Sequence, residues 1–290
     1  MSTAQDVNYI DVIKNIEDFY VDSSLNVQTI TSTGTKKYRP LTVEQLKRFI
    51  ELQISATKDE FGVLPGLEAV TQLNRIIIDN NVETNDASVL SEFTVLDRDA
   101  ILLQLRANTK SELEITGENE GDTVSVNLDD VVSRLKTAKL PKNLTERTKT
   151  IKYKSGTFKV KLSLPNLTID QQINGTFKKM VMPTLNKGAK HVEKTVDKVL
   201  STVYFLEIYK YISSITIEPK EGEPTVVNFR DMKNFGENYK LLDKLPTQVV
   251  TEISGYMTDV REFRETIFYY ENDDNKQLPI EIDVALFTGI

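Results

Sequence analysis

The chain has 290 residues, with 43 acidic and 36 basic side chains, which gives a formal net charge of −7. Apolar residues make up 39% and charged residues 27%, so there are enough apolar side chains for a core, unlike in a disordered protein. The sequence has no Cys, no Trp and one His, which excludes disulfides, thiol nucleophiles, thiolate-bound metals and any site built on two imidazoles.

Neither a secretory signal nor a membrane span is visible in the sequence. The first residues lack the basic and apolar stretches of a signal peptide. A transmembrane helix needs a run of about 18 or more apolar residues, and the apolar runs here, such as residues 76–78, are far shorter. We therefore expect the protein to be made and used in the cytoplasm.

The first predicted elements in chain order are a hairpin at residues 26–40 and a helix that follows it. β-Branched residues precede a turn at Gly34, and the returning strand ends at Pro40. Thr42 and Gln45 then form a capping box, in which each side chain bonds to the backbone N–H of the other residue. This pair predicts the start of a helix.

The first half of the chain closes with a helix and a second hairpin. The helix begins near Leu96 and places Leu96, Ala100 and Leu103 on one apolar stripe. The hairpin pairs residues 112–116 with residues 123–128 across a polar turn.

The second half repeats this order of elements. Residues 151–154 and 158–162 alternate about a turn at Gly156, which predicts a hairpin. Thr168 and Gln171 repeat the Thr-x-x-Gln cap and predict another helix start. The remaining predicted elements are a helix at residues 249–263 and a hairpin that pairs residues 266–270 with residues 278–284.

A long amphipathic helix is predicted within the second half, at residues 188–212. Apolar residues recur there at four- and three-residue spacing. The stripe has two interpretations, a face that packs on the core or a face that binds a partner, and the run is shorter than a coiled coil needs. The stripe consists of Val192, Val196, Val199, Val203 and Leu206.

These patterns predict an α+β protein made of two similar hairpin–helix–helix–hairpin units that arose by internal duplication. The predicted units are residues 1–130 and residues 131–290, and the long helix, at about 186–212, is inserted in the second. If the duplication is real, Pro40 and Pro165 occupy equivalent corners, each ending a hairpin before a capped helix.

Charge is unevenly distributed along the chain. A segment from residue 134 to 161 is strongly basic, and residues 252–283 are acidic. Such asymmetry is typical of solvated faces, of docking to a partner or a second copy, and of nucleic-acid binding. Tyr153 and Phe158 lie among the lysines in the sequence, and aromatic side chains in such places can stack on bases. The candidate docking residues are Arg134, Lys136, Lys139, Lys142, Arg147, Lys149, Lys152, Lys154, Lys159 and Lys161.

No catalytic or cofactor motif is present. The sequence contains no glycine-rich phosphate loop, no nucleophile elbow and no zinc-binding helix motif. The pairs Asp97/Asp99 and Asp129/Asp130 are interpreted as helix caps, residues 271–275 as a solvated turn, and His191 as a surface residue. We therefore expect neither catalysis nor a cofactor.

Two stretches of the sequence resemble the baseplate hub family of T-even-type contractile-tailed bacteriophages. Members show a glycine hairpin that runs into a Tyr/Phe-Arg-Pro signature, followed by an Asp-Arg helix that ends in Leu-x-Leu/Ile-Arg-Ala. The matching residues here are Gly34, Tyr38, Arg39, Pro40 and Thr42 in the first stretch, and Asp97, Arg98, Leu103, Leu105 and Arg106 in the second.

The resemblance implies a non-enzymatic tail protein, either a component of the baseplate hub or a factor for its assembly. Its partners would be other baseplate and tail proteins (hub, spike, tube or tape-measure proteins) or a second copy, without a membrane. It would be found in the host cytoplasm during assembly and, if structural, in the tail of the virion. The alternative that the residues leave open is a nucleic-acid-binding module that uses residues 134–161.

The resemblance also implies a specific difference in the two closing hairpins. Many relatives carry a Cys-x-x-Cys pair there, whereas this chain has residues 117–121 and 270–275 without cysteine. We therefore expect both turns to be free of metal and the hairpins to be held by cross-strand pairs, such as Ile115 with Val124 or Val126.

Overall fold

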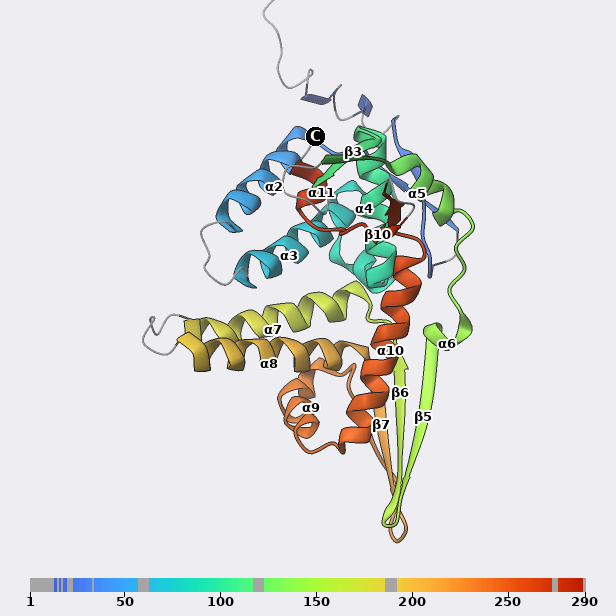
Figure 1. Cartoon of the computed structure of the whole chain (residues 1–290), viewed down its shortest axis with the longest axis vertical. Helices are drawn as coiled ribbons and strands as arrows, with labels where there is room; N and C mark the ends of the chain where they lie inside the picture. The colour runs from blue at the N-terminus through green and yellow to red at the C-terminus, as the bar shows by residue number, and fades with distance from the viewer. Residues whose placement is uncertain are drawn as a thin grey trace, which may run out of the picture.

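The computed structural model describes residues 13–14, 16, 18–19, 23–32, 34–56, 63–116, 123–185, 192–272 and 276–288. Long helices alternate with small antiparallel sheets along the chain, as Figure 1 shows. The predicted α+β class is therefore confirmed. Residues 117–121, residues 273–275 and His191, about which the sequence made predictions, lie outside the described residues.

The first half of the chain folds around one central helix, α4, which is buried on every side. The predicted stripe of Leu96, Ala100 and Leu103 is buried, and so are Ile101 and Leu102 on the other faces. The prediction of a one-sided helix was therefore too narrow, because α3, α5, α7 and β1 all contact α4. The elements of this half are β1 (Leu25–Gln28), β2 (Thr35–Tyr38), α2 (Val43–Ala56), α3 (Val63–Asn80), η1 (Ala87–Ser91), α4 (Val95–Thr109), β3 (Glu112–Thr116) and β4 (Thr123–Asn127).

The second half has more strands than the sequence predicted. Its elements are α5 (Leu128–Leu135), α6 (Lys142–Thr145), β5 (Glu146–Tyr153), β6 (Gly156–Ser163), α7 (Leu167–Leu185), α8 (Val192–Tyr211), β7 (Ile212–Pro219), β8 (Thr225–Asn228), η3 (Met232–Asn234), α9 (Phe235–Leu242), α10 (Thr247–Glu265), β9 (Tyr269–Glu271), β10 (Gln277–Pro279) and α11 (Ala285–Thr288).

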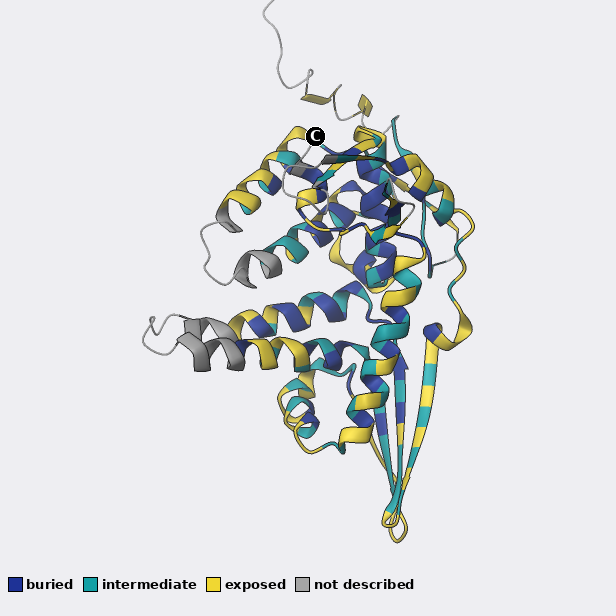
Figure 2. Ribbon diagram, in the orientation of Figure 1, coloured by how far each residue is buried: buried dark blue, intermediate teal, exposed yellow. Residues whose placement is uncertain are grey.

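A four-stranded antiparallel sheet in the order β5-β6-β7-β8 forms the lower part of Figure 1. The predicted β5–β6 hairpin is confirmed, with Tyr153 opposite Gly156 at its turn. The strands β7 and β8 were not predicted, and they continue this sheet. One face of the sheet packs on α10 with Val160, Leu162 and Ile215 buried. The outer strand β5 alternates between half-buried and exposed residues, as Figure 2 shows.

Helices α7 and α8 form a pair that projects from one side of the molecule (Figure 1). The helix α8 begins at Val192, and residues 186–191 of the predicted helix lie outside the described residues. Its predicted stripe is only partly buried, because Val199 and Leu206 are covered while Val203 is 39% exposed. None of the described helices combines the length and the apolar surface needed to cross a membrane.

The predicted cap of α7 is wrong. The helix begins at Leu167, one residue before Thr168, and the side chain of Asn166 accepts a hydrogen bond from the backbone N–H of Ile169 at 2.9 Å. An Asn carboxamide is as good a cap as a Thr hydroxyl. Asn166 directly follows Pro165, which lies in the connection between β6 and α7. Thr168 therefore lies inside the helix.

The C-terminal residues return to the first half of the chain. Phe287 stacks on Phe49 of α2 with ring centroids 4.6 Å apart, and β9 pairs with β10 through Leu278 opposite Tyr270. Buried side chains from both halves form one hydrophobic core. The division at residue 130 and the internal duplication stay predictions.

Candidate functional site

The first motif stretch fastens the β1–β2 hairpin to the end of α3. Tyr38 is fully buried, and Asn81 donates to its hydroxyl at 3.4 Å. Burial raises the pKa of Tyr38. The backbone N–H of Arg39 donates to the carbonyl of Asn80 at 2.7 Å, and the side chain of Asn80 donates back to the Pro40 carbonyl at 2.9 Å.

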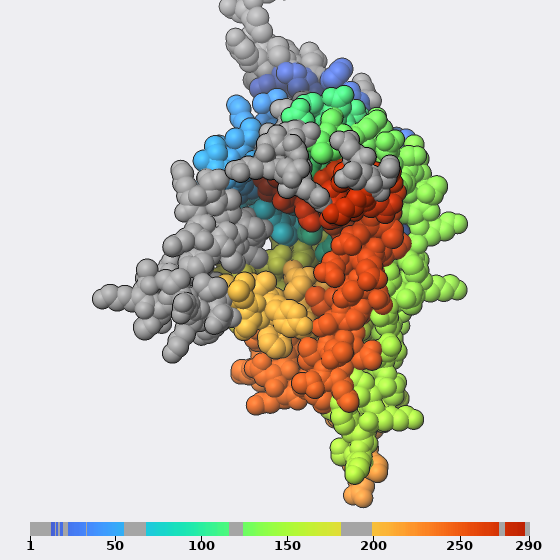
Figure 3. All heavy atoms as spheres, in the orientation of Figure 1, coloured from blue at the N-terminus to red at the C-terminus, as the bar shows by residue number. Residues whose placement is uncertain are grey.

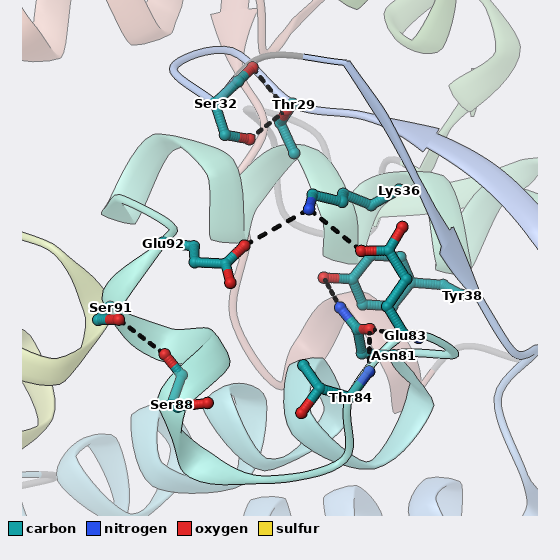
Figure 4. A network of polar contacts seen from close by, with 10 residues as sticks. All are labelled: Thr29, Ser32, Lys36, Tyr38, Asn81, Glu83, Thr84, Ser88, Ser91 and Glu92. Carbon is teal, nitrogen blue, oxygen red and sulfur yellow. Dashed lines mark hydrogen bonds and ion pairs between the residues drawn. The ribbon is translucent and has the colours of Figure 1, made fainter.

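A network of polar contacts extends this attachment to η1, as Figure 4 shows. The ammonium of Lys36 lies 3.1 Å from Glu83 and 3.4 Å from Glu92. The hydrogen bond to Glu83 raises the pKa of Lys36. The Asn81 carboxamide oxygen accepts the backbone N–H groups of Glu83 and Thr84 at 2.9 and 3.1 Å, which orders the chain after α3.

Two predicted features of the first motif are present at its ends. Gly34 has φ of +88°, a left-handed conformation that glycine adopts without strain. The predicted capping box is confirmed: Thr42 N–H donates to the Gln45 side chain at 2.9 Å, and Gln45 N–H donates to the Thr42 hydroxyl at 3.3 Å.

Asp97 has the capping role that the sequence predicted and a second role that it did not. It forms a capping box with Thr94 at the start of α4. The same carboxylate accepts the backbone N–H groups of Ile30 and Thr31, both at 2.8 Å, at the end of β1. One buried carboxylate thus joins the first hairpin to the central helix.

The other acidic residues that were interpreted as caps do not have this role. Asp99 forms an ion pair with Arg264 of α10 at 2.7 Å. The helix α5 is capped by Asn127, which accepts the N–H of Asp129 at 3.0 Å. Asp129 and Asp130 lie in the first turn, where negative charge still favours the helix dipole.

Arg106, at the end of the second motif, is buried, and no carboxylate within the described residues pairs with it. Its guanidinium donates to the carbonyls of Leu286 at 2.8 Å and Glu112 at 3.0 Å, and also to that of Lys110. Burial lowers the pKa of Arg106. The motif residues Leu103 and Leu105 are fully buried beside it. Arg106 therefore connects α4, β3 and the C-terminal helix α11.

A cluster of buried charges lies where α4, α7 and α8 meet. The Asp170 carboxylate of α7 lies 2.8 Å from Arg98 of α4 and 2.8 Å from Lys210 of α8. The exposed fractions of the three side chains are 4%, 14% and 10%. Burial would raise the pKa of Asp170, but the charges of Lys210 and Arg98 outweigh it and hold the pKa below its usual value.

The charged groups of this cluster pair with one another and with neighbouring polar side chains. Lys210 also pairs with Glu207 at 2.8 Å, and the Arg98 guanidinium donates a hydrogen bond to the Asn74 side-chain oxygen at 3.4 Å. Buried charges that pair with one another across helices favour one arrangement of those helices. The sequence did not indicate Asp170 or Lys210, because each is a single charged residue on a helix and their contact depends on the tertiary fold.

The ten basic candidates of the docking segment divide into two groups. Five are engaged within the chain: Arg134 with the Ile267 and Tyr269 carbonyls, Arg147 with Asp259, Lys149 with Glu252, Lys159 with Glu218, and Lys161 with Glu146. The other five are exposed and make no ion pair or side-chain hydrogen bond within the described part of the chain. They are Lys136, Lys139, Lys142, Lys152 and Lys154.

Part of the charge asymmetry is therefore neutralised internally. Arg147 and Lys149 of β5 face Asp259 and Glu252 of α10, so the basic and acidic segments contact each other. Arg134 is likewise bound to two backbone carbonyls, and the expectation that the ten basic residues form a docking surface stays a prediction. The five exposed lysines without an internal partner in the described part of the chain are the ones whose charge stays available to another molecule.

The aromatic residues among the lysines do not form a stacking surface with them. Tyr153 and Phe158 contact each other edge to face, with ring centroids 5.7 Å apart. Both lie on the face of the sheet that carries Arg147 and Lys149, while Lys152 points to the opposite face. Because strand residues alternate between faces, neighbours in the sequence are separated in the fold.

A polar hollow of about 710 Å³ lies beside Arg134, between β4, α5 and β9. Asp130, Tyr269 and Glu271 are among its lining residues. Within the described part of the chain, no group of three or more acidic or histidine side chains is placed to hold a metal ion.

Comparisons with known proteins give one match. The family described as T4 bacteriophage base plate protein matches residues 23–277. This confirms the resemblance drawn from the sequence at the level of a T4-type baseplate protein. No curated protein and no solved structure matches the chain significantly.

Proposed function

The chain belongs to the T4 bacteriophage base plate protein family, and from this membership we propose that it is a non-enzymatic protein of the contractile-tail baseplate hub or a factor for the assembly of that hub. The observation that carries the proposal is the family match, which spans nearly all of the described chain.

In this proposal the protein docks through its exposed lysines onto an acidic surface of another tail protein. These lysines follow one side of the molecule, from the end of α5 through α6 to the β5–β6 turn (Figure 1). Their charges are not compensated within the described part of the chain, unlike those of Arg147 and Lys149. Complementary charge fixes orientation and speeds encounter between partners.

The docking surface is tested by reversing charge at its upper end. A variant with Lys136→Glu, Lys139→Glu and Lys142→Glu should fail to support baseplate assembly in infected cells that lack the wild-type gene, while remaining folded by circular dichroism. The matched control reverses three exposed lysines elsewhere, Lys220→Glu, Lys233→Glu and Lys244→Glu, and should support assembly. Equal assembly with both variants would contradict the docking surface.

The two versions of the proposal differ in where the protein ends up. Mass spectrometry of purified virions finds the protein if it is a structural component. If it is absent from virions but baseplates fail to form without it, it is an assembly factor. Normal baseplates in its absence would contradict both versions.

Nucleic-acid binding remains the alternative outcome. It is tested by titrating the protein with a DNA duplex and a single-stranded RNA from low to physiological salt. Steeply salt-dependent binding would favour it, because phosphate contacts release counterions. We expect weak binding at most, because Tyr153 and Phe158 lie on the opposite face of the sheet from Lys152.

A further inference from the structure

The outer strand of the four-stranded sheet has an open edge. Within the part of the chain that the structure describes, the strand order β5-β6-β7-β8 leaves β5 with a partner on one side only. β5 is eight residues long, and it follows the free side of the molecule in Figure 1. Figure 3 shows the lime-green segment that contains β5 along the outer margin of the molecule. A long open edge is a template for another strand, and proteins usually cover or shorten it.

The hairpin register shows which backbone groups face outward. The two-residue turn is closed by the pair Tyr153 and Gly156, and a hydrogen-bonded pair closes such a turn. Hydrogen-bonded pairs alternate along an antiparallel ladder. The odd-numbered residues of β5 therefore bond to β6, and the even-numbered ones, Glu146, Thr148, Thr150 and Lys152, direct their backbone groups to the open edge.

The side chains of the same four residues also share a face and are exposed. They lie on the face of the sheet opposite to α10, which contacts Arg147 and Lys149 on the other side. The pattern Glu-x-Thr-x-Thr-x-Lys is self-complementary, because its acidic and basic ends exchange places when the strand is reversed. An antiparallel copy would place Glu146 opposite Lys152 and Thr148 opposite Thr150.

We propose that β5 pairs with β5 of a second copy in antiparallel orientation, joining two sheets into one across a two-fold axis at Lys149. In this register, each residue whose backbone groups point to the open edge lies opposite another such residue. A shift of the register by one residue would break this match. It puts two Glu–Lys pairs and two Thr–Thr pairs on the open face, and such cross-strand pairs are favourable. A two-fold interface of this kind is self-complementary.

Three existing contacts are compatible with the pairing. The backbone N–H of Glu146 donates to Lys142 within α6, so Glu146 offers its carbonyl to the second copy. Its carboxylate lies 2.7 Å from Lys161 and remains exposed to a further cation. Lys149 meets its own copy on the α10 face, where each ammonium already lies 3.3 Å from Glu252. The inference concerns self-association and does not depend on the proposed function.

The absence of cysteine from the chain allows a clean crosslinking test. At the two-fold axis the residues form a non-hydrogen-bonded pair with Cα atoms about 4.5 Å apart, within the range that a disulfide spans. Lys149→Cys should therefore form a disulfide-linked dimer under mild oxidation, and Lys154→Cys, in the exposed turn, should not. Adding Thr150→Pro should stop the crosslink, because it removes an outward N–H that is not part of the β5–β6 ladder.

The register is tested by charge reversal. Lys152→Glu and Glu146→Lys should each weaken the homodimer at least tenfold in sedimentation, while an equimolar mixture of the two variants should pair as tightly as the wild type. Lys154→Glu is the matched control and should leave the dimer unchanged. The proposal is overturned if the wild type stays monomeric at high micromolar concentration, if Lys154→Cys crosslinks as well as Lys149→Cys, or if the mixture pairs no better than its components.

Discussion

Asp170→Asn removes the anion from the buried charge cluster and leaves two cations there. Among the described carboxylates Arg98 then keeps Asp99, 4.0 Å from its Nε, and Lys210 keeps Glu207 at 2.8 Å. Breaking one partner of a buried ion pair costs about 3–5 kcal/mol. Because Glu207 still compensates Lys210, we expect a loss near the lower limit, about 3 kcal/mol in the free energy of unfolding.

The assay is thermal and urea unfolding followed by circular dichroism. For a chain of this size a loss of about 3 kcal/mol corresponds to a decrease in Tm of roughly 5 °C. The matched control is Glu237→Gln, which breaks a pair with Lys240 whose side chains are 80% and 73% exposed. Such exposed pairs contribute about 0–1 kcal/mol, so the control should unfold within about 2 °C of the wild type.

The pH dependence provides an independent check. The pKa of Asp170 lies below its ordinary value of 3.8 in the folded protein. Its stabilising contribution is therefore present above the unfolded pKa and is lost as the pH falls through the lower folded pKa. The difference in the free energy of unfolding between wild type and Asp170→Asn should be constant from neutral pH to about pH 5. It should become smaller below about pH 4.

A double-mutant cycle separates the ion pair from simple loss of packing. Asp170→Asn and Lys210→Met should couple by about 1–3 kcal/mol, because the second change removes the cation that the first leaves uncompensated. The reasoning is refuted if Asp170→Asn has the same Tm as the Glu237→Gln control, or if its loss of unfolding free energy persists unchanged at low pH. It is also refuted if the effects of Asp170→Asn and Lys210→Met are additive.

Three further changes test other parts of the structure by urea unfolding. Arg134→Ala should lower the free energy of unfolding by about 2 kcal/mol, because it removes charged hydrogen bonds to two carbonyls of the C-terminal segment. Lys136→Ala, an exposed control nearby, should stay within about 0.5 kcal/mol of the wild type. Equal losses would contradict the anchoring role of Arg134. Gly156→Ala should destabilise the fold more than Gly34→Ala, because a Cβ at Gly156 would clash with the Glu218 carbonyl while one at Gly34 meets no atom within 4 Å. We expect losses in the free energy of unfolding of about 3 and about 1 kcal/mol. The reverse order would be inconsistent with the β6–β7 contact. Thr42→Ala should lose about 1 kcal/mol with the capping box, and an unchanged midpoint would show that the cap is not needed.

The sequence predicted the candidate surface only in outline. The basic segment was evident, but strand alternation and the position of α10 decided which side chains stay exposed. Arg147 and Lys149 lie opposite Asp259 and Glu252, more than a hundred residues away in the chain, and no local pattern signals that contact. The buried Asp170 was missed for the same reason, since Arg98 reaches it only after α4 and α7 have packed together.

The sequence by itself determined the local elements of this protein. Alternation predicted the hairpins around Gly34 and Gly156, and the Thr42–Gln45 box predicted a helix start, because each depends on hydrogen bonds and side-chain spacing within a few residues. Only the tertiary structure decided that Arg106 would be buried among three carbonyls and that β5 would remain at an open edge. Burial and pairing of these residues depend on which distant segments pack together, and that choice is made by the core as a whole.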